Sequence, residues 1–398
     1  MRPLALRLSR LGTETAFEVL AKARALEAQG REVVHLEIGE PDFDTPPAVV
    51  AAGVAALERG ETHYTPSAGI PELREGVARW LAERRGVRAD PSQVIVTPGA
   101  KPIMFYALLA LLEDGDEAIY PDPGFPIYSS MIRFSGARAV PLPLRETNAF
   151  EPDLDELRSL ITPRTKVLVL NSPHNPTGGV LSPQAVRDIA RIARDADLWV
   201  LTDEIYGEVI YEGEHRSLLL EDGMAERAIL LDGFSKTYAM TGWRLGFGVF
   251  PGPLVDPLTK LVTNSVSCTA TFVQRAGAAA LALRPPEVDA MVRSFRERRD
   301  AIVDGLNAVP GITCLRPKGA FYVFPNVTGL GLGTSAEVAD RFLYEAGVAV
   351  LAGTAFGRGG EGYLRLSYAN SLANIRLALA RITEWAASAR TAAPSRLR

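Results

Sequence analysis

One lysine of this chain stands in a segment where arginine could not do the same chemistry. Lys236 lies in the middle of LDGFSKTYAMTGWRLGFG, residues 231–248, in a sequence where arginine supplies most of the positive charge. A guanidinium stays protonated, whereas a lysine amine can lose its proton, condense with a carbonyl as a Schiff base and carry protons. We therefore interpret Lys236 as a catalytic candidate. The ordinary alternative is a solvated loop lysine.

Three other predicted strands end in polar or small residues, as the strand before Lys236 does. Ligands bind at the carboxyl ends of strands in doubly wound sheets, where helix N-termini present unpaired N–H groups. Taken singly, these ends could be a tight turn, a proline and glycine turn and a helix cap. Their shared place in the topology favours one ligand. The four ends are VIVTPGAK with Gly99 and Ala100, VLVLNSPHNPTGG with Asn171 and Asn175, LWVLTDEIYGE with Asp203 and Tyr206, and AILLDGFSK with Ser235 and Lys236.

The chemistry of this set describes pyridoxal 5'-phosphate. A lysine can hold its aldehyde as a Schiff base, serine and arginine can bind its phosphate, and a carboxylate can keep its pyridine nitrogen protonated. No metal site is indicated, because Cys268 and Cys314 lie far apart with no CxxC or His–Cys cluster. We expect two reduced structural thiols and no disulfide framework.

Five segments closely resemble the class I aminotransferases, aspartate aminotransferase-like proteins of the pyridoxal-phosphate fold type I superfamily. The resemblance runs from about Ala21 to about Trp385, and its SKxxxxxGxRxG pattern is highly specific. It implies that the chain moves an amino group between an L-amino acid and a 2-oxo acid. The segments are SPHNPTGG, TDEIY, FSKTYAMTGWRLGF, LEIGEPDFDTP and YLRLSYAN.

The resemblance also implies roles for the matching residues around the cofactor. Lys236 would hold the cofactor covalently and carry the proton between the substrate α-carbon and the cofactor. Asp203 would pair with the protonated pyridine nitrogen, and Tyr206 and Asn175 would hydrogen-bond the phenolic oxygen of the ring. The remaining cofactor contacts would be Phe125, stacked on the ring, and the phosphate ligands Ser235, Arg244 and the N–H groups of Gly99, Ala100 and Lys101.

Arg365, in GYLRLSYAN, matches the arginine that binds the substrate α-carboxylate. Gly39, through its backbone, and Asn175 would complete this substrate site. The alternative is an exposed strand arginine in an arginine-rich protein. The alternating pattern of YLRLSY favours an inward-pointing side chain, which would couple substrate binding to closure of the two domains.

The side-chain pocket of the substrate has two opposed indications. Lys101 resembles a lysine that some bacterial aspartate aminotransferases place near the distal carboxylate of acidic substrates, although Pro102 departs from the related GGKQ pattern and favours a surface lysine instead. Phe125 donates no hydrogen bond, and with Ile127 and Tyr128 it predicts an apolar wall. We expect glutamate and 2-oxoglutarate as one substrate pair and a less polar amino acid as the other donor.

Tyr64, in HYTPSAGIPELREGVARW, resembles the tyrosine that reaches across a dimer interface to the cofactor phosphate of the partner. A loop aromatic that packs locally is the alternative. If the resemblance holds, the protein is a homodimer and each active site needs residues of two chains.

The elements that must position these residues follow an α/β pattern. Short apolar runs alternate with amphipathic stretches, which is typical of a mostly parallel sheet flanked by helices, here with seven strands. The predicted helices include Ala100–Leu112, Ser182–Asp195 and Val255–Thr263. The predicted strands are Val94–Thr97, Ala118–Tyr120, Arg138–Pro141, Val167–Leu170, Trp199–Thr202, Ala228–Leu231 and Gly246–Phe250.

After Ala282 the pattern changes to that of a smaller α+β domain built from both chain ends. One long charged helix follows a proline pair, strands are predicted at Ile312–Leu315, Phe321–Phe324 and Tyr363–Ser367, and VVHLEIGEPDF would add a strand from the N-terminal end. The predicted divisions are an N-terminal arm and part of the small domain at 1–45, the large cofactor-binding domain at 46–284, the small C-terminal domain at 285–388 and a disordered tail at 389–398.

Composition excludes several kinds of partner. The 398 residues carry a formal net charge of -4 with both signs interspersed, so neither a nucleic acid nor a membrane surface meets a basic face. Arginines at positions 2, 7 and 10 interrupt any signal-like apolar segment, and no run of about 18 apolar residues occurs. We expect a cytoplasmic protein whose partners are small molecules and a second copy of itself.

Two other functions compete with amino transfer. Lyases, cyclopropane-forming synthases and oxidases of the same superfamily act on amino acids with nearly the same residues. The effector domain of a transcription regulator is a second alternative, but it needs an N-terminal DNA-binding module, and only about twenty residues precede the resemblance.

Overall fold

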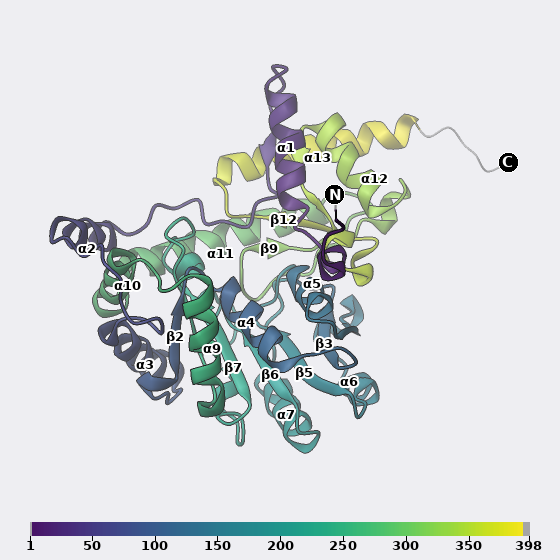
Figure 1. The fold of residues 1–398 in the computed structure, drawn as a ribbon. Helices are drawn as coiled ribbons and strands as arrows, with labels where there is room; N and C mark the ends of the chain where they lie inside the picture. The colour runs from purple at the N-terminus through teal and green to yellow at the C-terminus, as the bar shows by residue number, and fades with distance from the viewer. Residues whose placement is uncertain (1, 393–398) are drawn as a thin grey trace.

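The computed structural model describes residues 2–392, and its largest element is one seven-stranded sheet (Figure 1). The strand order is β2-β8-β7-β6-β5-β3-β4. Only β8 runs antiparallel to its neighbours, so the predicted mostly parallel sheet is confirmed. Its strands are β2 (Val94–Thr97), β3 (Glu117–Asp122), β4 (Arg138–Pro143), β5 (Thr165–Asn171), β6 (Trp199–Asp203), β7 (Ala228–Gly233) and β8 (Gly246–Val249).

Helices cover both faces of this sheet because alternate residues of its strands point to opposite sides. In β5, Val167 and Val169 pack with α4 (Lys101–Leu111), α5 (Ile127–Phe134) and α9 (Gly252–Ser265). Leu168 and Leu170 pack on the other face with α6 (Leu154–Leu160) and α7 (Pro183–Asp195). On that second face β2, β7 and β8 are covered by α3 (Pro71–Arg85) and α10 (Thr271–Leu283), and α2 (Pro47–Glu58) packs on α10.

A smaller set of strands lies at one end of the sheet with α1 (Ala16–Glu27), α12 (Ser335–Arg341) and α13 (Leu372–Ala392), and α11 (Pro286–Asn307) runs between the two parts (Figure 1). β1 (Val34–His35) pairs in parallel with β10 (Val348–Ala349), so a strand from near the N-terminus joins the C-terminal part. A second, antiparallel sheet has the order β11-β12-β9, formed by Leu351–Ala352, Leu364–Ser367 and Tyr322–Val323. The domain limits expected at residues 45 and 284 remain predictions.

Two sequence predictions differ from the structure. Residues 312–315 form no strand, only an isolated bridge from Thr313 to Asn326, because the side chain of Asn307 pairs with both the N–H and the carbonyl oxygen of Cys314. The disordered tail expected from residue 389 is also wrong at its start, since α13 continues through Ala392 in an alanine-rich stretch that favours helix. The rest of that tail, 393–398, lies outside the described residues.

The N-terminal segment before α1 lies against the large sheet's helices rather than beside the small part alone. Its short helix η1 (Leu6–Arg10) packs on α5, and the N–H of Gly12 donates to the Ser130 hydroxyl over 2.8 Å. Arg10 pairs with Asp114 and Glu14 pairs with Lys101. The segment therefore bridges the two parts of the molecule near the start of α4.

Within residues 2–392, none of the helices has the length and apolar content that crossing a bilayer requires.

Candidate active site

Lys236 lies in the short helix α8 (Phe234–Thr237), which begins directly after β7. Its Nζ donates a 2.7 Å hydrogen bond to the carbonyl oxygen of Gly39, a residue the sequence assigned to substrate binding. Burial lowers the pKa of Lys236 to about 8, with Glu40 opposing the shift and Arg365 adding to it. The amine is therefore more readily neutral, and so more nucleophilic, than an ordinary lysine.

Asp203 ends β6, is buried, and lies close enough to Lys236 for that charge to lower its pKa. Its carboxylate accepts a 2.6 Å hydrogen bond from the hydroxyl of Tyr128 and a 3.2 Å one from the N–H of Ile205. Burial raises the pKa of Asp203 to about 6 although both hydrogen bonds favour the charged form. The hydroxyl of Tyr128 therefore binds the carboxylate of Asp203, and the apolar wall expected from Phe125, Ile127 and Tyr128 remains a prediction.

Asn171 and Asn175 lie in the loop that follows β5. The Asn171 side chain donates to the carbonyl oxygen of Asp203 over 3.0 Å and accepts from the N–H of Asn175 over 2.9 Å, which ties the loop to the end of β6. The side-chain oxygen of Asn175 is buried and has no hydrogen-bond partner within the described residues. Such an atom indicates a missing polar partner at this position.

Tyr206 meets a residue that the sequence analysis did not select. Its hydroxyl lies 2.7 Å from that of Tyr322, which comes from β9 in the smaller part of the molecule. Tyr322 also stacks on the guanidinium of Arg365 at 4.6 Å, and a side chain at Gly39 would collide with its hydroxyl. The apolar run GAFYVF around Tyr322 predicted only a strand. The one feature of this run that could have indicated a site residue is the polar hydroxyl of its tyrosine.

Arg365 is buried on β12, as the alternation of YLRLSY predicted, and not exposed. It donates to the carbonyl oxygen of Glu37 and lies over the rings of Tyr322 and Phe356. Its Nε has no partner among the described residues, and burial lowers the pKa of the guanidinium. A buried guanidinium with an unused N–H is suited to bind a carboxylate.

The predicted phosphate ligands lie near the end of β2 and the start of β8. Gly99 has φ of 85°, and a Cβ there would collide with the guanidinium of Arg244. Gly246 lets β8 approach the turn, since its Cβ would lie 2.5 Å from the N of Ala100. Ser235 is buried in α8 next to Lys236, and Arg244 holds the left-handed φ of 53°, a conformation that often marks functional sites.

Lys101 is the first residue of α4, and its ammonium lies 5.5 Å from the centre of the Phe125 ring. It pairs with the carboxylate of Glu14, a residue absent from the sequence prediction. Phe125 in turn packs edge-on against Tyr128. Lys101 is half exposed, so the structure combines the predicted pocket position with the surface exposure of its alternative.

Tyr64 is 88% exposed in the single chain. A groove of about 670 Å³ opens beside Arg244, lined among others by Phe43, Pro98, Trp243 and Cys268.

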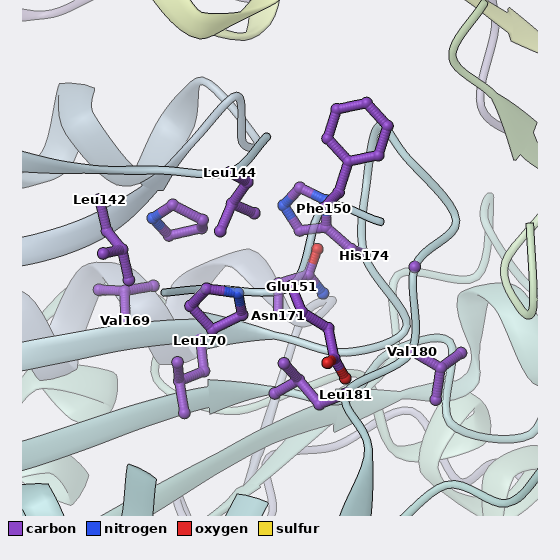
Figure 2. Close-up of a pocket in the computed structure, with 13 residues that line it drawn as sticks. Leu142, Leu144, Phe150, Glu151, Val169, Leu170, Asn171, His174, Val180 and Leu181 are labelled. Carbon is purple, nitrogen blue, oxygen red and sulfur yellow. The ribbon is translucent and has the colours of Figure 1, made fainter. Parts of the chain in front are cut away.

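A second cavity, of about 30 Å³, lies behind the loop at 171–181 (Figure 2). Figure 2 shows the His174 imidazole beside Phe150, with Leu142, Val169 and Leu170 on the apolar side. The volume suits one or two water molecules and no larger ligand. Burial lowers the pKa of His174 to about 3, so this ring is neutral.

The residues fit pyridoxal 5'-phosphate as the sequence expected. The Gly99 turn held against Arg244, the buried carboxylate of Asp203 and the activated amine of Lys236 supply the donors, charges and nucleophile that its phosphate, ring and aldehyde need. The buried side-chain oxygen of Asn175 adds a hydrogen-bond acceptor that has no partner within the described residues. No group of three His, Cys, Asp or Glu side chains among the described residues is arranged to hold a metal ion.

Comparison with known proteins gives a single answer. The model of the family "Aminotransferase class I and II" matches residues 31–382. An aspartate aminotransferase of Pyrococcus horikoshii is 44% identical over 369 residues, 92% of each chain, and aromatic-amino-acid aminotransferase 2 of Thermococcus litoralis is 41% identical over 89% of this chain and 92% of its own. The solved aspartate aminotransferase of Thermus thermophilus with maleate superimposes with a TM-score of 0.93 at 39% identity, covering 97% of this chain and all of that one.

Proposed function

The chain belongs to the class I and II aminotransferases, pyridoxal-phosphate-dependent transaminases of fold type I, and we propose that it moves the amino group of an L-amino acid to a 2-oxo acid with glutamate and 2-oxoglutarate as one substrate pair. The cofactor of this family is pyridoxal 5'-phosphate. Small-molecule amino acids and 2-oxo acids are its substrates. The proposal below concerns which residues bind them.

One observation carries the proposal. The amine of Lys236 donates to the carbonyl oxygen of Gly39, and the guanidinium of Arg365 donates to that of Glu37, two residues earlier in the same segment. In an α-amino acid the amino group and the carboxylate share one carbon, so a reacting amine and a carboxylate-binding arginine must lie close together. This spacing supports an α-amino acid substrate.

When bound, pyridoxal phosphate stabilises negative charge on the substrate α-carbon. Arg365 would bind the α-carboxylate and fix the orientation of that carbon. Lys236, with its pKa lowered to about 8, would act as a base that removes the proton from the substrate α-carbon. Its protonated amine would then deliver that proton to the cofactor. Asp203 would keep the ring nitrogen protonated, and Asn175 and Tyr206 would donate to the ring oxygen.

The pair of Lys101 and Glu14 supports the choice of glutamate. The carboxylate of Glu14 binds the ammonium of Lys101 beside Phe125, in the way that the distal carboxylate of a dicarboxylic substrate would bind it. Maleate, present with the Thermus thermophilus protein, is also a dicarboxylate. The Thermococcus litoralis relative is named for aromatic amino acids, which supports a less polar second donor against the ring of Phe125.

We also propose a homodimer in which Tyr64 of one chain reaches the phosphate site of the other. The exposed hydroxyl of Tyr64 and the open groove at Arg244 support this arrangement. A cytoplasmic location is part of the proposal and is tested by cell fractionation.

A panel of amino donors against 2-oxoglutarate and pyruvate tests the reaction, with each new amino acid quantified. We expect a new amino acid only when a 2-oxo acid is supplied, with glutamate among the best donors. Release of ammonia or consumption of oxygen without a 2-oxo acid would instead indicate a lyase or an oxidase of the same fold.

A further inference from the structure

A buried cluster of charges lies behind the strand ends that carry Asp203 and Lys236. Its centre is Arg85, the last residue of α3, whose side chain is only 3% exposed and lies 4.8 Å from the ring of Trp80. Nη1 donates to the carboxylate of Glu204 over 3.0 Å, and Nη2 lies 2.7 Å from the carboxylate of Asp232. Nε lies 3.6 Å from the carboxylate of Glu208, so three carboxylates meet at one guanidinium.

Two of these carboxylates belong to the segments that carry the proposed catalytic residues. Glu204 directly follows Asp203 and precedes Tyr206, while Asp232 stands near the end of β7, just before Ser235 and Lys236. Consecutive residues of an extended chain point to opposite sides, so Glu204 faces Arg85 while Asp203 faces Tyr128. Arg85 thus contacts both segments from behind.

The strand ladder stops at this point. The N–H of Glu204 donates to the carbonyl oxygen of Leu231 over 2.9 Å, and the paired register of β6 and β7 ends at Asp203 and Leu231. One residue further, Glu204 and Asp232 would stand opposite each other as like charges. The guanidinium of Arg85 joins their side chains there, one residue beyond the last paired positions of the two strands.

Further contacts hold Glu204 and Arg85 in place. Glu204 also accepts hydrogen bonds from Ser217 over 2.9 Å and contacts His215 over 2.8 Å, so its second oxygen is occupied too. A Cβ at Gly207, the residue after Tyr206, would lie 2.5 Å from Nη2 of Arg85. The guanidinium therefore lies directly against the backbone that carries Tyr206.

We propose that Arg85 is a positioning residue for the transamination site: by bridging Glu204 and Asp232 it sets the spacing between Asp203 with Tyr206 on one strand end and Ser235 with Lys236 on the next. It contacts neither substrate nor cofactor. A planar guanidinium can bind two carboxylates at once through separate nitrogens, whereas a lysine ammonium is a single point of charge. The inference rests on the proposed roles of those four residues.

Arg85→Lys in the holoenzyme tests the bridge, because it keeps the buried charge and removes the two-sided geometry. We expect kcat to fall about tenfold and the dissociation constant of pyridoxal phosphate to rise about tenfold, at the lower end of effects seen when outer contacts around a reactive group are removed. KM for both substrates should change less than about twofold. The visible circular dichroism of the bound cofactor, which reports ring orientation, should change with kcat.

Arg79→Met is the matched control. Arg79 lies on the same helix, six residues before Arg85, and is exposed, so its loss should leave all these values within about twofold. The double variant Arg85→Met/Asp232→Asn removes the bridge without adding a net buried charge, and it should reproduce the Arg85→Lys effects if the lysine variant folds poorly.

A lower melting temperature with unchanged kcat, cofactor affinity and circular dichroism, in whichever of these variants folds, would overturn the proposal and leave a purely structural role. Failure of borohydride to fix the cofactor to Lys236 in the wild type would contradict the proposed function itself and not the bridge.

Discussion

Glu14 forms an ion pair with Lys101 beside the ring of Phe125, from a position 87 residues earlier in the chain. The N-terminal segment thus places a carboxylate on the ammonium proposed to bind the distal carboxylate of glutamate. Substrate and Glu14 would compete for one cation. Loss of Lys101 should therefore raise KM for glutamate, and loss of the Glu14 carboxylate should lower it.

We predict that Lys101→Ala raises KM for glutamate about tenfold or more, while KM for an aromatic donor changes little. A charge-assisted hydrogen bond contributes about 1.5–3 kcal/mol. Glu14→Gln should lower KM for glutamate, because it removes the competing carboxylate. Steady-state kinetics with both donors check this, and an equal loss for both donors in Lys101→Ala would show that Lys101 does not bind the distal carboxylate.

The covalent site is predicted to be Lys236. The wild type should be yellow, and borohydride should fix the cofactor to this residue. Lys236→Ala should lower kcat at least about a thousandfold, since a positioned proton-transfer group contributes about 10²–10⁴. The variant should still bind the cofactor non-covalently through the phosphate contacts. Peptide mapping locates the adduct, Lys260→Ala on the exposed face of α9 is the control, and an adduct on another lysine would refute the assignment.

The lowered pKa of Lys236 predicts how its condensation with the cofactor aldehyde depends on pH. Only the neutral amine reacts, so with a pKa of about 8 the reactive fraction rises about fivefold from pH 7 to pH 8 and levels off above about pH 9. Arg365→Met removes a positive charge that lowers this pKa and should move the plateau to higher pH. Stopped-flow absorbance of apoenzyme mixed with cofactor measures the rate. A rate still rising tenfold per unit above pH 9 in the wild type would contradict the lowered pKa.

Active sites shared between chains predict complementation. Mixing Tyr64→Ala with Lys236→Ala should restore activity to at most about a quarter of the wild-type value, because random exchange makes half of the dimers hybrids with one intact site each. Each variant alone is the control. Full activity in a demonstrated monomer, or no recovery after verified exchange, would argue against a shared site.

Acid stability should depend on His174. Its folded pKa of about 3 lies below the ordinary value near 6.5, so the unfolded state binds the extra proton between these pH values. Stability is therefore present above pH 6.5 and is lost as pH falls, by about 1.4 kcal/mol per pH unit. His174→Gln should unfold with a shallower dependence between pH 6 and pH 4, as urea titrations at each pH will measure. Parallel curves for the two proteins would contradict a buried neutral histidine.

Much of the large sheet could be predicted because its strands are apolar runs bounded by turns, and apolar runs of that length are buried wherever they lie. All seven predicted strands are present with ends shifted by a few residues. The strand expected at 312–315 was wrong because the side chain of Asn307, the last residue of α11, satisfies the backbone of Cys314, a contact that the periodicity of the sequence does not predict.

In the candidate site too, the sequence predicted some features and only the structure showed the others. Lys236, Asp203, Asn175, Gly99 and Arg365 were predictable, because each stands in a short local pattern at a strand end or on an alternating strand, and such patterns specify both position and direction. The tertiary structure alone decided their partners. Tyr128 on Asp203, Tyr322 on Tyr206, Glu14 on Lys101 and Arg85 between Glu204 and Asp232 each join segments at least 75 residues apart. Contacts of that kind depend on how helices and sheets pack against one another, which the local sequence around either partner does not determine.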